Sequence, residues 1–220
     1  MKLKNNYKLI IAADGSAASG KTTGSKIISK KFKLNFLSSG LLYRFASYQI
    51  LKHKPKNKIS FLKKTFSTLK LNRLKTINLH TPEISNFTSI IAKEKKIRDI
   101  LKSFQIKFEK KHKKVCIEGR DIGTVILPNA DIKFFFTCSL KVAAKRRFNE
   151  LRKTNKNIKL NDVKKSIKIR DNRDKNRKNS PLIQSKDAVI VRTDKLKNIA
   201  GMIKKLSSDI DRKIKDKYGS

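Results

Sequence analysis

A glycine-rich string near the N-terminus has the spacing that holds phosphate groups. Residues 15 to 22 read Gly-Ser-Ala-Ala-Ser-Gly-Lys-Thr and fit the pattern G-x-x-x-x-G-K-[ST] without a gap. Small residues let backbone N–H groups wrap a diphosphate, and the helix that follows presents its positive N-terminus to the same anion. Lys21 would reach the β- and γ-phosphates, and the Thr22 hydroxyl would ligate Mg²⁺.

A chance glycine loop is the alternative interpretation of this string. The apolar run before it and the helical pattern after it favour nucleoside triphosphate binding instead, because the motif needs a strand on one side and a helix on the other. We expect the following residues to contact the nucleotide phosphates: Gly15, Ser16, Ala17, Ala18, Ser19, Gly20, Lys21, Thr22 and Thr23.

Arginines gather in a second stretch, late in the chain. Residues 170 to 178 hold Arg170, Arg173, Lys175, Arg177 and Lys178, together with Asp171 and Asp174. Helical spacing predicts one face for Arg170, Arg173, Asp174 and Arg177. A solvated, self-pairing charged face is the alternative, but arginine is scarcer than lysine in this chain, and guanidinium groups suit bidentate phosphate recognition.

Two shorter strings each follow an expected strand. One is Gly-Arg-Asp-Ile-Gly-Thr at 119–124, and the other is Ser-Ser-Gly at 38–40 with Tyr43 and Arg44 after it. Each alone could be an ordinary turn with a surface arginine. Ligands of open α/β sheets bind at the carboxyl ends of the strands, so together these strings predict a crevice for a second phosphorylated substrate.

Alternating strand and helix patterns must position these groups. The apolar runs predict an α/β fold, a parallel sheet with helices on both faces. Strands are expected at 8–13, 35–37, 115–117, 133–138 and 188–191. Helices are expected at 22–32, 41–51, 59–71, 97–108, 140–151, 163–174 and 196–218. The stretch 52–86 is less regular, with a possible strand at 77–79.

The composition is strongly basic. With 56 Lys and Arg against 17 Asp and Glu in 220 residues, the formal net charge is +39. A polyanion-binding surface is one interpretation. The lysines are spread along the whole chain, however, and Lys, Asn, Ile and Phe all have codons rich in A and T, so base-composition drift is favoured. We therefore expect no specific nucleic acid partner.

Other features exclude several protein classes. The hydrophobic content of 38% lies in strand-like and helix-like blocks, which argues against a disordered chain. Cys116 and Cys138 stand in apolar runs and are expected to be buried core thiols rather than metal ligands. No apolar run is long enough for a membrane span, and the run before Asp14 is too short for a signal peptide, so we expect a cytoplasmic protein.

The strings together resemble bacterial cytidylate kinases, in the nucleoside monophosphate kinase group. The resemblance rests on residues 14–15, 39–44, Gly-Arg-Asp-Ile-Gly-Thr-Val at 119–125, Arg-Asp-x-Arg-Asp-x-Asn-Arg at 170–177 and Pro-Leu at 181–182. It implies a P-loop NTPase fold in one kinase domain over 1–220. A small monophosphate-binding insertion would lie at approximately 45–95, and an arginine-bearing lid at approximately 152–180.

The resemblance also implies an activity and roles for residues. ATP, with Mg²⁺, would phosphorylate CMP or dCMP in pyrimidine nucleotide metabolism. Independently of the resemblance, the sequence has no extended apolar stripe for a partner surface, so a monomer is expected. By the family pattern, cytosine would be contacted by Ser39, Ser89, Arg98 and Asp121. The acceptor phosphate would be held by Arg44, Arg120, Arg170 and Arg177, with Asp174 near the sugar. The residues expected to be catalytic are Lys21, Arg120, Arg170 and Arg177.

Departures from the family pattern keep alternatives open. Ser38 and Glu118 stand where the family usually has Asp, Ala143 stands where it tends to have Arg, and the insertion looks shortened around 75–89. A kinase for UMP or another monophosphate is therefore the nearest alternative. An ATP-using, basic nucleic-acid-binding protein is a more distant one.

Overall fold

The computed structural model describes residues 7–153 and 155–219. Residues 1–6, 154 and 220, which belong to the expected 1–220 domain and in part to the expected 152–180 lid, lie outside the described residues. The chain forms two compact units, one up to Phe36 and from His112 onward, the other Leu37–Lys111. The expected insertion at 45–95 falls within the second unit, and its role in binding stays a prediction.

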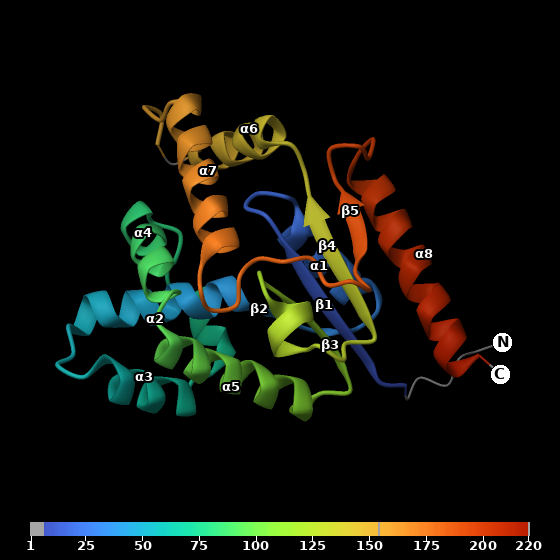
Figure 1. Ribbon diagram of the computed structural model, residues 1–220, viewed down its shortest axis with the longest axis horizontal. Coiled ribbons are helices and arrows are strands. Elements are labelled where there is room, and N and C mark those ends of the chain that lie inside the picture. The colour runs from blue at the N-terminus through green and yellow to red at the C-terminus, as the bar shows by residue number, and fades with distance from the viewer. Residues whose placement is uncertain (1–6, 154, 220) are drawn as a thin grey trace. The chain divides into compact units, whose positions relative to one another are not determined.

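A five-stranded sheet runs through the first unit (Figure 1). Its strands are β1 (Leu9–Gly15), β2 (Asn35–Ser38), β3 (Lys114–Glu118), β4 (Ile132–Thr137) and β5 (Val189–Arg192), in the order β2-β3-β1-β4-β5. β1 pairs in parallel with β3 and β4, and β4 with β5. All residues of β1 are buried, as a central parallel strand covered on both faces requires. The expected parallel α/β sheet is confirmed.

The register of the sheet brings three strand ends together. Ala13 of β1 lies beside Glu118 of β3, and Gly15 lies beside Phe136 of β4. The string after β1 and the string after β3 therefore start at the same edge of the sheet. This is the edge at which the sequence predicts ligand binding.

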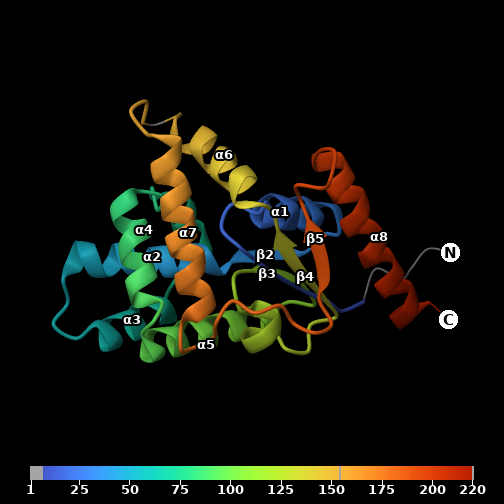
Figure 2. The same cartoon turned by 45° about the horizontal axis from the view of Figure 1, so that its top comes forward.

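Among the described residues, the first unit has four α-helices, besides a short π-helical turn at Ile122–Ile126. They are α1 (Lys21–Lys31), α6 (Leu140–Leu151), α7 (Leu160–Asn176) and α8 (Ile199–Tyr218). Phe134 and Phe136 of β4 form a core cluster with Leu206 and Ile210 of α8, and both views show α8 beside β5 (Figure 2). Ala143 and Ala144 of α6 cluster with apolar residues of α7. No described helix is long and apolar enough to cross a membrane.

The second unit is helical. It contains α2 (Ser39–His53), α3 (Lys58–Ser67), a short 3₁₀ turn (Leu71–Lys75), α4 (Pro82–Ile91) and α5 (Lys95–Lys111). Helix α4 was not predicted from the sequence, although its start is well marked. The Thr81 side chain accepts a hydrogen bond from the Ile84 N–H, and Pro82 follows at once.

The possible strand at 77–79 is wrong. These residues form a loop in which Leu79 is buried and its carbonyl accepts a hydrogen bond from Arg44. The hydrogen-bonding need of the Leu79 carbonyl is therefore met by a side chain of α2 and not by a neighbouring strand. Three residues are too few for period-two alternation to distinguish a strand from a loop with one buried side chain.

Candidate active site

The phosphate-binding string forms a tight loop between β1 and α1. Gly15 has φ +151°, and a Cβ there would lie 2.1 Å from the Phe136 carbonyl oxygen, so only glycine fits. Gly20, at φ +84°, precedes the first residue of α1. No side chain caps this helix and its first turn is free of acidic residues, which leaves its positive end suited to an anion.

Lys21 and Thr22 both face the carboxylate of Glu118. Lys21 Nζ lies 3.5 Å from Glu118 Oε2, and the Thr22 hydroxyl donates to Glu118 Oε1 at 3.1 Å. Burial lowers the pKa of Lys21 to about 8, with Arg120 lowering it further and Glu118 opposing the change. A bound anion would favour the charged form of this lysine further.

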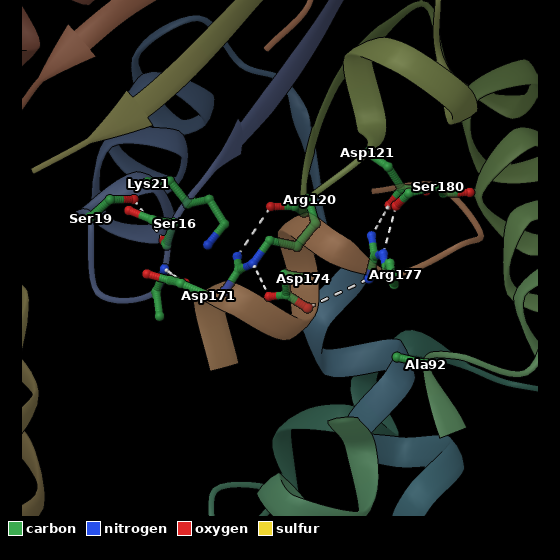
Figure 3. A network of polar contacts seen from close by, with 12 residues as sticks. Ser16, Ser19, Lys21, Ala92, Arg120, Asp121, Asp171, Asp174, Arg177 and Ser180 are labelled. Carbon is green, nitrogen blue, oxygen red and sulfur yellow. Dashed lines mark hydrogen bonds and ion pairs between the residues drawn. The ribbon is translucent and has the colours of Figure 1, made fainter. Parts of the chain in front are cut away.

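Four of the predicted charged residues form one connected network (Figure 3). Arg120 Nε donates to Asp174 Oδ2 at 2.8 Å. Arg177 lies 3.6 Å from Asp174 through Nη1 and 3.6 Å from Asp121 through Nη2. It also donates from Nε to the Ser180 carbonyl at 2.6 Å. The strings at 119–124 and 170–177, distant in sequence, are thus brought together.

Arg170 lies close enough to Arg120 of this network for their charges to repel. Burial lowers the pKa of Arg170 to about 10, and Arg120 is the next cause. Burial by itself would raise the pKa of Asp174, but Arg120 and Arg170 hold it below its ordinary value. Arg120 has a raised pKa despite its burial, chiefly because of Asp174. The carboxylate of Asp174 therefore stabilises the charged forms of the buried arginines around it.

Sequence reasoning missed Asp14 as part of this site. Its buried carboxylate accepts hydrogen bonds from the N–H groups of Ile122 and Gly123 at 2.8 and 2.7 Å. It thereby ties the end of β1 to the string that carries Arg120 and Asp121. A lone charged residue closing an apolar strand, directly before the phosphate loop, was the signal that could have identified it.

The other predicted substrate residues lie in the second unit. Arg44 is buried and donates to the Leu79 carbonyl at 2.9 Å and the Ser85 hydroxyl at 2.8 Å. Arg98 is buried, donates to the Ala92 carbonyl at 3.1 Å and has its guanidinium 5.6 Å from the Tyr43 ring centroid. Ser39 is buried at the start of α2, and the Ser89 hydroxyl donates to the Asn86 carbonyl at 2.8 Å. Their roles stay predictions.

Two expectations near the site are corrected. Arg173 is exposed, whereas Arg170, Asp174 and Arg177 are half-buried, because α7 turns position 173 toward solvent. Cys116 is buried, but Cys138 is only half-buried, since it follows the end of β4 and lies beside the phosphate loop, its Sγ 3.9 Å from the Ala18 carbonyl. Within the described ranges, no cluster of three His, Cys, Asp or Glu side chains could hold a metal ion.

Comparisons with known proteins agree on one family. The family model described as "Cytidylate kinase" matches residues 11–212. A cytidylate kinase of Clostridium botulinum (strain Loch Maree / Type A3) is 38% identical over 214 residues, covering 92% of this chain and 97% of the relative. One of Rickettsia africae (strain ESF-5) is 37% identical over 187 residues, covering 84% of each chain.

Solved structures share the fold at low sequence identity. An uncharacterized protein from Eubacterium ventriosum ATCC 27560 gives a TM-score of 0.53 at 14% identity, covering 93% of this chain and 99% of its own. Shikimate kinase from Bacteroides thetaiotaomicron gives 0.50 at 12% identity, covering 92% and 98%. At such identities the likeness concerns the fold alone.

Proposed function

The chain belongs to the cytidylate kinase family, and on this premise we propose that it transfers the γ-phosphoryl group of ATP to CMP or dCMP, giving ADP and CDP or dCDP. The observation that carries the proposal is the meeting of two arginine-bearing strings, 119–124 and 170–177, in one network beside the buried Lys21, whose pKa Arg120 lowers. A phosphate loop alone would serve many reactions. The buried arginines beside the loop favour an anionic acceptor as the second substrate.

Phosphoryl transfer requires the protein to position the two substrates and to neutralise their charge, and it requires no general base. The attacking oxygen of a nucleoside monophosphate is already anionic at neutral pH, so holding it in line with the γ-phosphate is the main requirement. Lys21, Arg120, Arg170 and Arg177 would neutralise the charge spread over donor and acceptor. Asp174 supports this role by pairing with Arg120 and Arg177, which limits the directions in which their guanidinium groups can point.

Magnesium fits the oxygen donors beside the loop. The hydroxyl of Thr22 and the carboxylate of Glu118 lie within hydrogen-bond distance of each other, 3.1 Å apart, and Mg²⁺ prefers one or two protein oxygens with substrate phosphates. Bound there, the ion would supply positive charge that offsets the charge of the ATP phosphates. Thr22 and Glu118 are the residues that we expect to hold it, directly or through water.

Recognition of the cytosine base is the finer part of the proposal. We assign Ser39, Ser89, Arg98 and Asp121 to the base, and Arg44 to the acceptor phosphate, by the family pattern. The burial of Arg98 and Asp121 supports a recognition role, because a buried charged group has strong directional preferences for its partners. Ser38, Ala143 and the shortened stretch at 75–89 are the departures that make a direct test necessary.

A coupled ADP-release assay tests the proposal. The protein is supplied with Mg-ATP and with CMP, dCMP, UMP or AMP, each near ~1 mM, because enzyme KM values commonly fall below that concentration. We expect turnover to be fastest with CMP and dCMP. Preference for UMP or AMP would keep a monophosphate kinase but refute the base assignment, and absence of turnover with all four would refute the proposal.

A further inference from the structure

A carboxylate from the arginine-bearing helix reaches the phosphate loop. Asp171 Oδ1 of α7 accepts a hydrogen bond from the backbone N–H of Ala17 at 2.9 Å. Figure 3 shows Asp171 beside the loop residues Ser16 and Lys21, on the same helix as Asp174. The proposed transfer reaction assigns no task to this hydrogen bond, which joins residues 154 positions apart.

The contact lies in the last part of α7, next to the residues Arg170 and Asp174. Farther toward the start of the helix, Val163 and Ile167 belong to the same apolar cluster as Ala17 and the alanines of α6. Apolar packing of this kind is non-directional, so it does not by itself orient a polar side chain of α7. The hydrogen bond of Asp171 is directional, and it falls between Arg170 and the turn that carries Asp174.

We propose that Asp171 is a positioning residue for phosphoryl transfer: its carboxylate fastens α7 to the phosphate loop and thereby sets Arg170 and the Arg120–Asp174 pair relative to the ATP phosphates. The inference rests on the proposed function and deepens it. Arg170 directly precedes Asp171, so a shift of the fastening point moves the guanidinium with it. Displacements near 1 Å of a catalytic group can cost roughly 100-fold in rate.

Two substitutions at position 171 distinguish the hydrogen bond to Ala17 from the negative charge of the carboxylate. Asp171→Ala removes the acceptor, whereas Asp171→Asn removes the charge and keeps an amide oxygen that can accept from the Ala17 N–H. The matched control is Asn172→Ala, an exposed neighbour on the same helix. Each protein is compared with the parent in kcat, in KM for ATP and for CMP, and in its thermal unfolding midpoint.

The kinetic expectation is a split between kcat and KM. Asp171→Ala should lower kcat by roughly 10- to 100-fold, change KM for CMP by less than about threefold and leave the thermal midpoint nearly unchanged, because the arginines remain present but are misplaced. Asp171→Asn should keep kcat within about threefold of the parent. A kcat of Asp171→Ala within about twofold of the parent, or equal losses in the Ala and Asn variants, would overturn the proposal.

Amide hydrogen exchange tests the fastening without any activity. In the nucleotide-free protein the Ala17 N–H should exchange roughly tenfold faster in Asp171→Ala than in the parent, and at the parent rate in Asn172→Ala. Equal exchange in parent and Asp171→Ala would overturn the inference. If the parent turned over no monophosphate, the proposed function would fail, while the exchange comparison would still decide whether Asp171 holds the loop.

Discussion

Asp14 should make the stability of the protein depend on pH in an unusual direction. Its burial raises its pKa to about 6 from the ordinary 3.8, although the N–H groups of Gly123 and Ile122 favour the charged form. The folded protein therefore binds a proton at Asp14 more readily than the unfolded chain does. Its contribution to stability is fully present below pH about 4 and is lost as the pH rises through about 6.

The magnitude follows from the two pKa values. At about 1.4 kcal/mol for each pH unit, the difference between about 6 and 3.8 corresponds to about 3 kcal/mol. Asp14→Asn cannot titrate. The free energy of unfolding of the parent, minus that of Asp14→Asn, should thus fall by a smaller amount, about 2 kcal/mol, between pH 4 and pH 8, because the loss has already begun at pH 4. The subtraction cancels the titration of all other groups that the substitution leaves undisturbed.

Urea unfolding followed by circular dichroism is the suitable assay, because the chain has no Trp for fluorescence. The control is Asp187→Asn, whose exposed parent carboxylate has its pKa held below the ordinary value by the Ser185 hydroxyl. Its parent-minus-variant difference should change in the opposite sense, growing as the pH rises through about 4. A difference for Asp14→Asn that stays constant within ~1 kcal/mol would refute the reasoning about its burial.

Four further outcomes are expected. Arg177→Ala should lower kcat/KM roughly 10³-fold, whereas Arg173→Ala, at an exposed position of the same segment, should keep a kcat/KM near that of the parent. Equal effects of the two substitutions in steady-state kinetics would contradict the site assignment. Gly15→Ala should abolish ATP binding in calorimetry because its Cβ would lie 2.1 Å from the Phe136 carbonyl oxygen, whereas Gly201→Ala, whose Cβ would meet nothing closer than 3.7 Å, should bind normally. Thr22→Ala should raise the Mg²⁺ concentration for half-maximal rate about tenfold, and an unchanged Mg²⁺ titration would remove the hydroxyl from the proposed metal site. Arg120 holds the pKa of Asp174 low against its burial, which gives stability that is present above pH about 4 and lost on further acidification. The free energy of unfolding should therefore fall less on acidification in Asp174→Asn than in the parent. Identical acid profiles would argue against the ion pair.

The phosphate loop and the parallel sheet were predictable from the sequence because their determinants are local. Gly15 and Gly20 take backbone angles that other residues rarely adopt, and the fully buried strand before them needs an unbroken apolar run. Each expected strand except 77–79 is present. Helix α4 was missed because its periodic signal is short and stands in an irregular stretch.

The partners of the charged groups could not be predicted in this way. Nothing in the string 170–177 tells which carboxylate Arg120 will meet, or that Arg173 faces solvent while Arg177 turns inward. Helical spacing gives the angle of a side chain about its own axis. It does not give the axis of the neighbouring element, on which every ion pair across elements depends.

The amino-acid sequence by itself determined the family, the sheet and the residues that make a phosphate loop, since each of these follows from residue types at fixed separations along the chain. The tertiary structure alone decided that Asp14 supports the string 119–124 and that Asp171 reaches Ala17. These contacts join positions more than 100 residues apart, and their carboxylates are buried or half-buried. Only chain packing brings such groups within hydrogen-bond distance, and only burial gives the bonds their weight by removing competing water.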